Sequence, residues 1–293
     1  MRELSGKVAV VTGASSGIGR ALAVRFAAEG MSLMLADVDA RGLTETAAMA
    51  SEAAAMASGD SGAVSTGSGG KVLTQITDVS DAPAVHHLAN RAFGELGGVH
   101  VLCNNAGVFQ GGRMWTRTEE DFAWLLGVNV WGVLHGIREF VPRMIEQDTE
   151  GHIVNSVSVA GLFAGPNLGG QAVSKYAALA ASQALAHDLR QVGSKLRVTA
   201  LCPGGVRTGI SRSERVRPAD LAVARTRDDL SSQEWLDEVV DKGVDPAEVA
   251  DATVDAIRDE RFLVLTHEGY ERSLREQISA LLDGEIPEPP DYE

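Results

Sequence analysis

The chain has 293 residues, 44% of them hydrophobic, and carries 26 basic against 40 acidic side chains, a formal net charge of −14. This acidic balance disfavours nucleic acids and anionic membrane surfaces as partners, because both repel negative charge at long range. No apolar run approaches the roughly 20 residues of a membrane-spanning helix and no export signal precedes the first predicted strand, so we expect a cytoplasmic protein.

Short, β-rich apolar runs alternate along the chain with segments of helical length. We predict strands at 7–11, 32–36, 72–76, 99–103, 152–155, 198–201 and 262–265. Between them we predict helices at 18–29, 41–56, 82–95, 119–147, 172–192 and 247–258. This alternation is typical of one α/β domain spanning 1–293, a doubly wound parallel sheet of about seven strands with helices on both faces.

Two segments depart from the alternation. Residues 58–70 are almost entirely Gly, Ser, Ala and Thr, which predicts an inserted surface loop. Residues 207–245 are polar and charged, and a connection of that length usually forms a lid, here expected to contain short helices.

A glycine-rich segment, Thr12 to Gly19, follows the first predicted strand and leads into the first predicted helix. Glycines at such a junction allow a tight turn and let the backbone approach a pyrophosphate, which then faces the helix N-terminus. The strand before and the helix after distinguish this segment from an ordinary turn. We therefore predict a dinucleotide-binding loop that contains Gly13, Ser15, Ser16, Gly17, Ile18 and Gly19.

Asp37 ends the second predicted strand, 18 residues after Gly19 (37 − 19). A carboxylate here can accept hydrogen bonds from the adenosine ribose hydroxyls, whereas it would repel a 2′-phosphate. NAD is therefore favoured over NADP, although Arg41 nearby would soften the repulsion. The alternative is that Asp37 only caps the next turn. The two cysteines, Cys103 and Cys202, lie in apolar stretches, so we expect buried thiols and no metal site.

Further motifs follow other predicted strands, in this order: Asp78-Val79, Asn104-Asn105-Ala106-Gly107, Ser158, Ser174-Lys175 on the next helix, and Pro203-Gly204-Gly205-Val206-Arg207-Thr208. Together with the glycine-rich loop, they resemble the motifs of the short-chain dehydrogenase/reductase family over nearly the whole chain. Open α/β sheets bind ligands at the carboxyl ends of their strands, where these motifs fall. The resemblance implies a Rossmann-type fold, an NAD(H) cofactor and a small-molecule substrate.

The resemblance also implies roles for individual cofactor-binding residues. Asp78 and Val79 would approach the adenine, Asn105 would line the ribose region, and Lys175 would bond the nicotinamide ribose. The carboxamide end of the cofactor would meet the segment that contains Pro203, Gly204, Val206 and Thr208.

Members of this family carry a catalytic set of Asn, Ser, Tyr and Lys, in which Ser orients the substrate oxygen and Tyr transfers the proton. The resemblance matches Asn129, Ser158 and Lys175 to three of the four. The tyrosine position, four residues before the lysine and thirteen after the serine, holds Gln171. A carboxamide can hydrogen-bond a carbonyl but does not titrate near neutral pH. Because residues 171 and 175 share a helix face, we expect Gln171 to point into the site.

Apolar side chains on the loops after the strands predict an apolar substrate. For any one of them, core packing or a subunit contact is the alternative. These residues are Phe109, Met114, Trp115, Leu162, Phe163 and Leu168. The lid carries four arginines. They would bind a carboxylate or phosphate of an acyl-type substrate or, as we favour, form a solvated charged surface: Arg207, Arg212, Arg215 and Arg217.

The helices predicted at 119–147 and 172–192 resemble the pair through which family members dimerise, and the second is rich in alanine, which permits close helix packing. We expect a homodimer or homotetramer. The alternative is a hetero-oligomer with an active homologue.

Three functions are therefore open. The preferred one is an NAD(H)-dependent oxidoreductase that interconverts a secondary alcohol and a ketone. The second is a catalytically impaired NAD-binding subunit or sensor, motivated by Gln171. The third is a non-redox lyase or dehydratase that keeps NAD as a structural element and uses Gln171 as an oxyanion donor.

Overall fold

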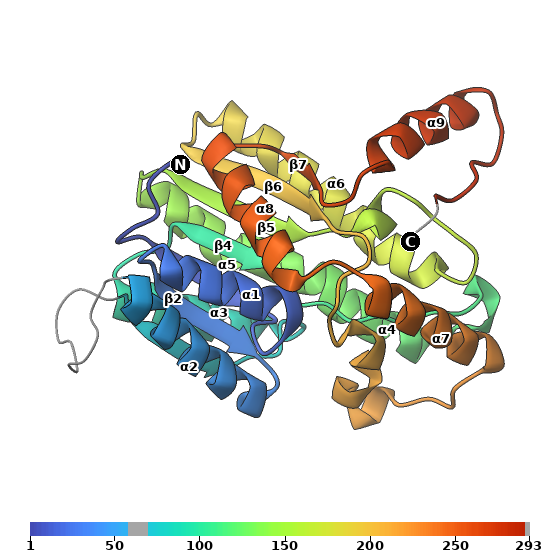
Figure 1. The fold of residues 1–293 in the computed structure, drawn as a ribbon, viewed down its shortest axis with the longest axis horizontal. Helices are drawn as coiled ribbons and strands as arrows, with labels where there is room; N and C mark the ends of the chain where they lie inside the picture. The colour runs from blue at the N-terminus through green and yellow to red at the C-terminus, as the bar shows by residue number, and fades with distance from the viewer. Residues whose placement is uncertain (58–69, 291–293) are drawn as a thin grey trace.

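Seven parallel strands form one sheet in the order β3-β2-β1-β4-β5-β6-β7 in the computed structural model (Figure 1). The structure describes residues 1–57 and 70–290. The strands are β1 (Val8–Thr12), β2 (Ser32–Asp37), β3 (Val72–Ile76), β4 (Val101–Asn104), β5 (Gly151–Ser156), β6 (Leu196–Cys202) and β7 (Leu263–Leu265). The sequence prediction of each strand is thus confirmed to within about two residues at either end. The insertion predicted at 58–70 lies outside the described residues except for Gly70.

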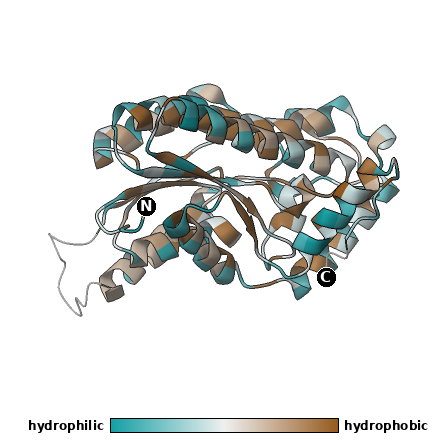
Figure 2. Ribbon diagram, turned by 90° about the horizontal axis from the view of Figure 1, so that it is seen from above, coloured by the Kyte–Doolittle hydropathy of each residue, from teal (hydrophilic) through white to brown (hydrophobic). Residues whose placement is uncertain are grey.

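Helices cover both faces of the sheet (Figure 2). One face packs against α1 (Gly17–Ala28), α2 (Ala40–Ala57) and α8 (Pro246–Asp259), and the other against α3 (Ala82–Leu96), α5 (Gly132–Glu146) and α6 (Gly169–Gln191). The side chains of β1 divide between these layers, because successive residues of a strand point to opposite faces. Ala9 and Val11 join the first hydrophobic cluster, and Val10 joins the second. No helix in the described part of the chain is long and apolar enough to cross a bilayer.

The helix predicted at 119–147 is interrupted. It consists of α4 (Glu119–Leu126), a π-helical turn at Gly127–Trp131, and α5. The turn carries Asn129, whose side chain pairs with the backbone of Val108 on the loop after β4. Single π turns within α-helices frequently occur at functional sites. The sequence does not predict this interruption, because helix periodicity carries no sign of a tertiary contact such as the pairing with Val108.

The segment predicted as a lid, 207–245, contains two 3₁₀ helices, η4 (Ile210–Val216) and η5 (Ala219–Leu221), followed by α7 (Arg227–Lys242). The expected short helices are present, but α7 is longer than expected, with 16 residues. A further helix, α9 (Tyr270–Leu282), follows β7 and was not predicted.

Candidate functional site

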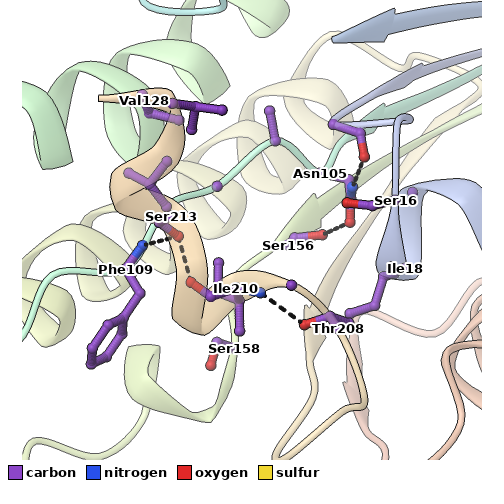
Figure 3. Close-up of a pocket in the computed structure, with 18 of the residues that line it drawn as sticks. Ser16, Ile18, Asn105, Phe109, Val128, Ser156, Ser158, Thr208, Ile210 and Ser213 are labelled. Atoms are coloured by element: carbon purple, nitrogen blue, oxygen red, sulfur yellow. Dashed lines mark hydrogen bonds between the residues drawn. The ribbon is translucent and has the colours of Figure 1, made fainter. Parts of the chain in front are cut away.

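A cavity of about 330 Å³ opens beyond the carboxyl ends of the strands. In the sheet, β1 lies between β2 and β4, so the strand order reverses at this point, where open α/β sheets place their ligands. Every cofactor-binding and catalytic residue predicted from the sequence lines this cavity, with the exception of Asn129. Figure 3 shows Ser16, Ile18, Asn105, Ser158 and Thr208 around the same space, although they come from distant parts of the chain.

The glycines of the loop between β1 and α1 have no room for side chains. A Cβ on Gly19 would lie 2.1 Å from the carbonyl oxygen of Gly13, and Gly17 has a φ of +52° and would contact Thr208. Ser16, the N-cap of α1, makes no side-chain capping hydrogen bond, so the first N–H groups of the helix remain available to an anion. This cradle fits the diphosphate of a dinucleotide.

Asp37 at the end of β2 lines the same cavity. Its Oδ2 accepts a hydrogen bond from Ser15 N at 2.9 Å, and its Oδ1 accepts one from Asp39 N at 3.0 Å. The carboxylate therefore does cap the turn after β2, and through Ser15 N it also holds the glycine-rich loop in place. Each oxygen has lone-pair capacity left for a ribose hydroxyl.

Asn105 connects the ends of three strands. Its Nδ2 donates to the carbonyl of Thr12 on β1 at 3.0 Å, and its Oδ1 accepts from Ser156 Oγ on β5 at 3.1 Å. The Ser156 contact is visible in Figure 3. Asn105 thus fixes the floor of the cavity at the place where the resemblance puts the cofactor ribose.

Ser158 follows β5 with φ 67° and ψ 159°, a conformation that L-residues rarely adopt. Its Oγ donates to the carbonyl of Pro203 at 3.4 Å and accepts from Ala160 N at 3.3 Å. Both contacts are long, which leaves the hydroxyl able to turn toward a ligand in the cavity. The backbone strain is consistent with a position selected for function rather than for stability.

Lys175 on α6 is buried, and its Nζ donates to the carbonyl oxygen of Ser156 at 2.8 Å. Burial disfavours the charged ammonium and lowers the pKa of Lys175 from 10.5 to about 8. The nearby thiol of Cys202 affects it little, because burial raises the pKa of that thiol to about 12 and keeps it neutral. Lys175 can therefore exchange a proton near neutral pH.

Gln171 lines the cavity one helical turn before Lys175, as predicted. Asn129 lies behind it, buried, with its Nδ2 at 3.1 Å from Ser174 Oγ and at 3.5 Å from Gln171 Oε1. Ser174 Oγ in turn donates to the carbonyl of Gln171 at 2.8 Å. Asn129 therefore contacts Gln171 from the side away from the cavity and does not line the cavity itself.

The tyrosines that the structure describes lie away from the cavity. Tyr176, one residue beyond Lys175, donates its hydroxyl to the carbonyl of Leu162. Tyr270 is buried next to Phe163, and neither tyrosine is among the residues that line the cavity. Neither of these phenols therefore replaces the missing one.

The substrate side of the cavity is largely apolar. Of the apolar residues proposed from the sequence, Phe109 and Leu168 line it. Those that do not line it are Met114 and Trp115, which are exposed, and Leu162 and Phe163, which pack in a core cluster. Sequence reasoning missed the contributions of α4 and of the lid segment, which include Trp124, Val216, Leu221, Trp235 and Val239. No local signal marks them, because their part in the site depends on how the lid folds back.

The four arginines of the lid segment have different surroundings. Arg207 pairs with Asp245 at 3.0 Å, and Arg217 forms a buried ion pair with Asp121 at 2.9 Å. Arg212 is exposed, whereas Arg215 is exposed and also lines the cavity. Arg207 therefore joins the two ends of the lid segment, Arg217 fastens the segment to α4, and only Arg215 of the four faces the ligand space.

Comparison with known proteins places the chain among oxidoreductases of one family. The model of the family described as short chain dehydrogenase matches residues 7–218. A 1-deoxy-11-beta-hydroxypentalenate dehydrogenase of Streptomyces avermitilis is 33% identical over 278 residues, covering 94% of this chain and 90% of the relative. A short chain dehydrogenase/reductase of Burkholderia phymatum, solved in complex with NAD, has 40% identity and a TM-score of 0.91, with 99% of each chain covered. The chain belongs to the short-chain dehydrogenase/reductase family.

Proposed function

We propose that the chain is an NAD(H)-dependent oxidoreductase that interconverts a secondary alcohol and a ketone on an apolar or acyl-type substrate in the cytoplasm. The observation that carries this proposal is that Ser158, Gln171 and Lys175 line the same cavity as the glycine-rich loop at the start of α1. A nicotinamide cofactor, when bound, supplies or accepts the hydride. The protein then has to hold the substrate oxygen and manage one proton.

The cofactor would be held along the cavity from Asp37 to Thr208. The start of α1 would bind the diphosphate, Asp37 the adenosine ribose, and Lys175 the nicotinamide ribose. Asp78 and Val79 would line the adenine end. NAD is preferred over NADP because the Asp37 carboxylate would repel a 2′-phosphate. The NAD complex of the Burkholderia phymatum relative supports this choice.

The substrate would lie between Ser158 and the lid segment. Trp124, Trp235 and Phe109 contribute large apolar surfaces there, which favours an apolar body on the substrate. Ser158 would orient the reacting oxygen, and Asn129 would act through Gln171 as a positioning residue.

Gln171 also favours a second candidate function, an NAD-binding subunit with little turnover of its own. The resemblance to the family implies a tyrosine where this chain has Gln171, and a carboxamide cannot serve as a general acid. Such a subunit would act in a hetero-oligomer with an active homologue. Otherwise we propose a homodimer or homotetramer formed through α4, α5 and α6, where Trp131, Val173 and Tyr176 are exposed.

The functions are separated by two measurements on the purified chain. Calorimetry with NAD, NADH and NADP tests the cofactor, and we expect NAD to bind at least tenfold more tightly than NADP. A panel of secondary alcohols and ketones, followed by NADH absorbance, tests redox turnover. Cofactor binding without turnover would favour the subunit, and product formation without net change in NADH would favour a lyase. No binding of any nicotinamide dinucleotide by folded protein would refute the proposal.

A further inference from the structure

Reduction of a ketone needs a proton as well as a hydride, and few groups in the cavity can supply one. Among the described residues, the ionisable side chains that line the cavity are Asp37, Asp78, Lys175 and Arg215. Arginine does not deprotonate in proteins. Asp37 ends β2, which is three strand positions from β5, or about 14 Å at ordinary strand spacing. Asp78 follows β3, one position further. Of these groups, only Lys175 lies on the helix that carries Gln171, and it bonds the end of β5 two residues before Ser158.

The surroundings of Lys175 leave its ammonium able to reach a ligand. One of its three N–H groups is used by the carbonyl of Ser156, and no carboxylate among the described residues pairs with it. Gly107 faces it, and a Cβ at that position would lie 3.5 Å from Nζ. The missing side chain at residue 107 therefore keeps space open beside the nitrogen. Cys202 on β6 is the titratable group whose charge would act on Lys175, and it stays a neutral thiol.

The orientation of the Gln171 amide follows from a chain of hydrogen bonds. Val108 presents both its N–H and its carbonyl to Asn129, so Oδ1 must face the N–H (2.9 Å) and Nδ2 must face the carbonyl (3.0 Å). Nδ2 is a donor, so the atom of Gln171 that faces it at 3.5 Å has to be the acceptor Oε1. The Nε2 group of Gln171 makes no hydrogen bond with any described residue, which leaves it to donate into the cavity.

We infer that Lys175 is the proton donor and acceptor of this site, and that Gln171 Nε2 and Ser158 Oγ hold the substrate oxygen. The inference rests on the proposed function. In reduction, the carbonyl carbon gains a hydride from the reduced cofactor, and the carbonyl π electrons move to the oxygen. The oxygen takes one proton from the Lys175 ammonium, which becomes a neutral amine and is reprotonated from solvent. Oxidation of the alcohol runs the same steps backward and begins with the neutral amine.

The first test is the pH dependence of turnover with the most active ketone and alcohol of the panel. Ketone reduction should fall, and alcohol oxidation should rise, as the pH passes through about 8. Lys175→Arg keeps a positive charge but cannot release a proton, so it should lower both rates 10²- to 10⁴-fold and abolish this pH dependence. The matched control is Lys195→Arg at an exposed lysine just before β6, and it should behave as the native chain. An unchanged pH midpoint in Lys175→Arg would overturn the role of Lys175.

The second test does not need turnover. Carbon NMR of lysine labelled at Cε, with the Lys175 signal identified by its loss in Lys175→Met, reports the titration of Nζ directly in the native protein. A midpoint near 8 supports the inference, and a midpoint at the ordinary 10.5 refutes it.

A third test addresses the amide. Gln171→Glu replaces a donor by an anion and should reduce kcat/KM at least 10²-fold, whereas Gln183→Glu on the exposed face of α6 should have no effect. Equal activity of Gln171→Glu and the native chain would refute the donor role. Failure to bind NADH would instead refute the proposed function itself, so the two failures are distinguishable.

Discussion

Arg217 of the lid segment and Asp121 of α4 form an ion pair 2.9 Å long in which both side chains are at most 4% exposed. The guanidinium of Arg217 also lies 5.0 Å from the ring of Trp124, a residue that lines the cavity. On the cavity side, Ser213 Oγ accepts a hydrogen bond from Phe109 N at 3.0 Å, as Figure 3 shows. Residues 210–221 are thus held against α4 and the loop after β4 by contacts within the protein.

Asp121→Asn should destabilise the protein and weaken substrate binding together. Asp121 faces the buried guanidinium groups of both Arg217 and Arg117, and removing the carboxylate from such a buried cluster costs about 3 kcal/mol. We expect this loss in urea unfolding and a higher KM for the substrate. Asp148→Asn removes one partner of an exposed pair with Lys195 and should cost less than about 1 kcal/mol. Equal stability of the two variants would show that the buried pair does not fasten the lid.

Gln171→Tyr should raise the rate of ketone reduction by about tenfold or more. A phenol beside the buried cation of Lys175 would ionise near neutral pH and provide a better-placed acid than the lysine alone. The measurement is kcat from NADH absorbance, with Gln183→Tyr on the exposed face of α6 as the control. A variant slower than the native chain would mean that the amide has a role that a phenol cannot fill.

Lys175→Met should make the fold more stable while it removes activity. The pKa of Lys175 is lowered in the folded state, so the folded protein carries a buried cation below pH 8 that the unfolded chain holds in water. The fall from 10.5 to about 8 corresponds to about 3 kcal/mol, and the lost hydrogen bond to Ser156 offsets about 1 kcal/mol. We expect a net gain of about 2 kcal/mol at pH 7 in urea unfolding.

The sign of this effect can be checked by varying the pH. Between pH 8 and 10.5 the unfolded chain binds more protons at this residue than the folded chain does, so the stability of the native protein rises with pH. The advantage of Lys175→Met should therefore shrink over that range and disappear above it. An advantage that stayed constant from pH 7 to 10.5 would contradict the lowered pKa.

Gly19→Ala should abolish binding of the dinucleotide. The added Cβ would lie 2.1 Å from the carbonyl oxygen of Gly13 and 2.7 Å from Asn105 Nδ2, so the loop and the first turn of α1 would have to separate. Gly94→Ala on α3 meets nothing within 4 Å and should bind NAD normally while gaining about 0.5–1 kcal/mol of stability. Calorimetry with NAD on both variants checks the pair. Normal binding by Gly19→Ala would show that the diphosphate is held elsewhere.

The sheet could be predicted from the sequence because buried parallel strands consist of short apolar runs, such as Val198 to Leu201. Their carboxyl ends meet at one edge, so motifs scattered from Gly13 to Thr208 could be assigned to one site before any coordinates. The relation between Gln171 and Lys175 followed from helix geometry alone, because both are on one helix.

Tertiary contacts account for what the sequence did not reveal. Trp235 lines the cavity only because α7 folds back over it, and nothing in the local pattern of that helix marks the residue. Met114 and Trp115 are apolar residues between β4 and α4, yet in the 3₁₀ turn at Met114–Thr116 both are exposed. Asn129 was matched to the catalytic set, but its position behind Gln171 depends on a contact with Val108 from another loop.

The π turn at Gly127–Trp131 makes residue count, as well as residue type, a constraint on this protein. Removing one residue there would restore a regular helix from α4 into α5 and would leave the two helices in nearly the same relative orientation, because the wider turn accommodates one extra residue. Phe140, Val141 and Met144 would keep their places in the core that α5 shares with α3. Asn129, however, would lose the position from which it pairs with Val108, so a shorter turn would leave the core intact while removing the side chain that lies behind Gln171.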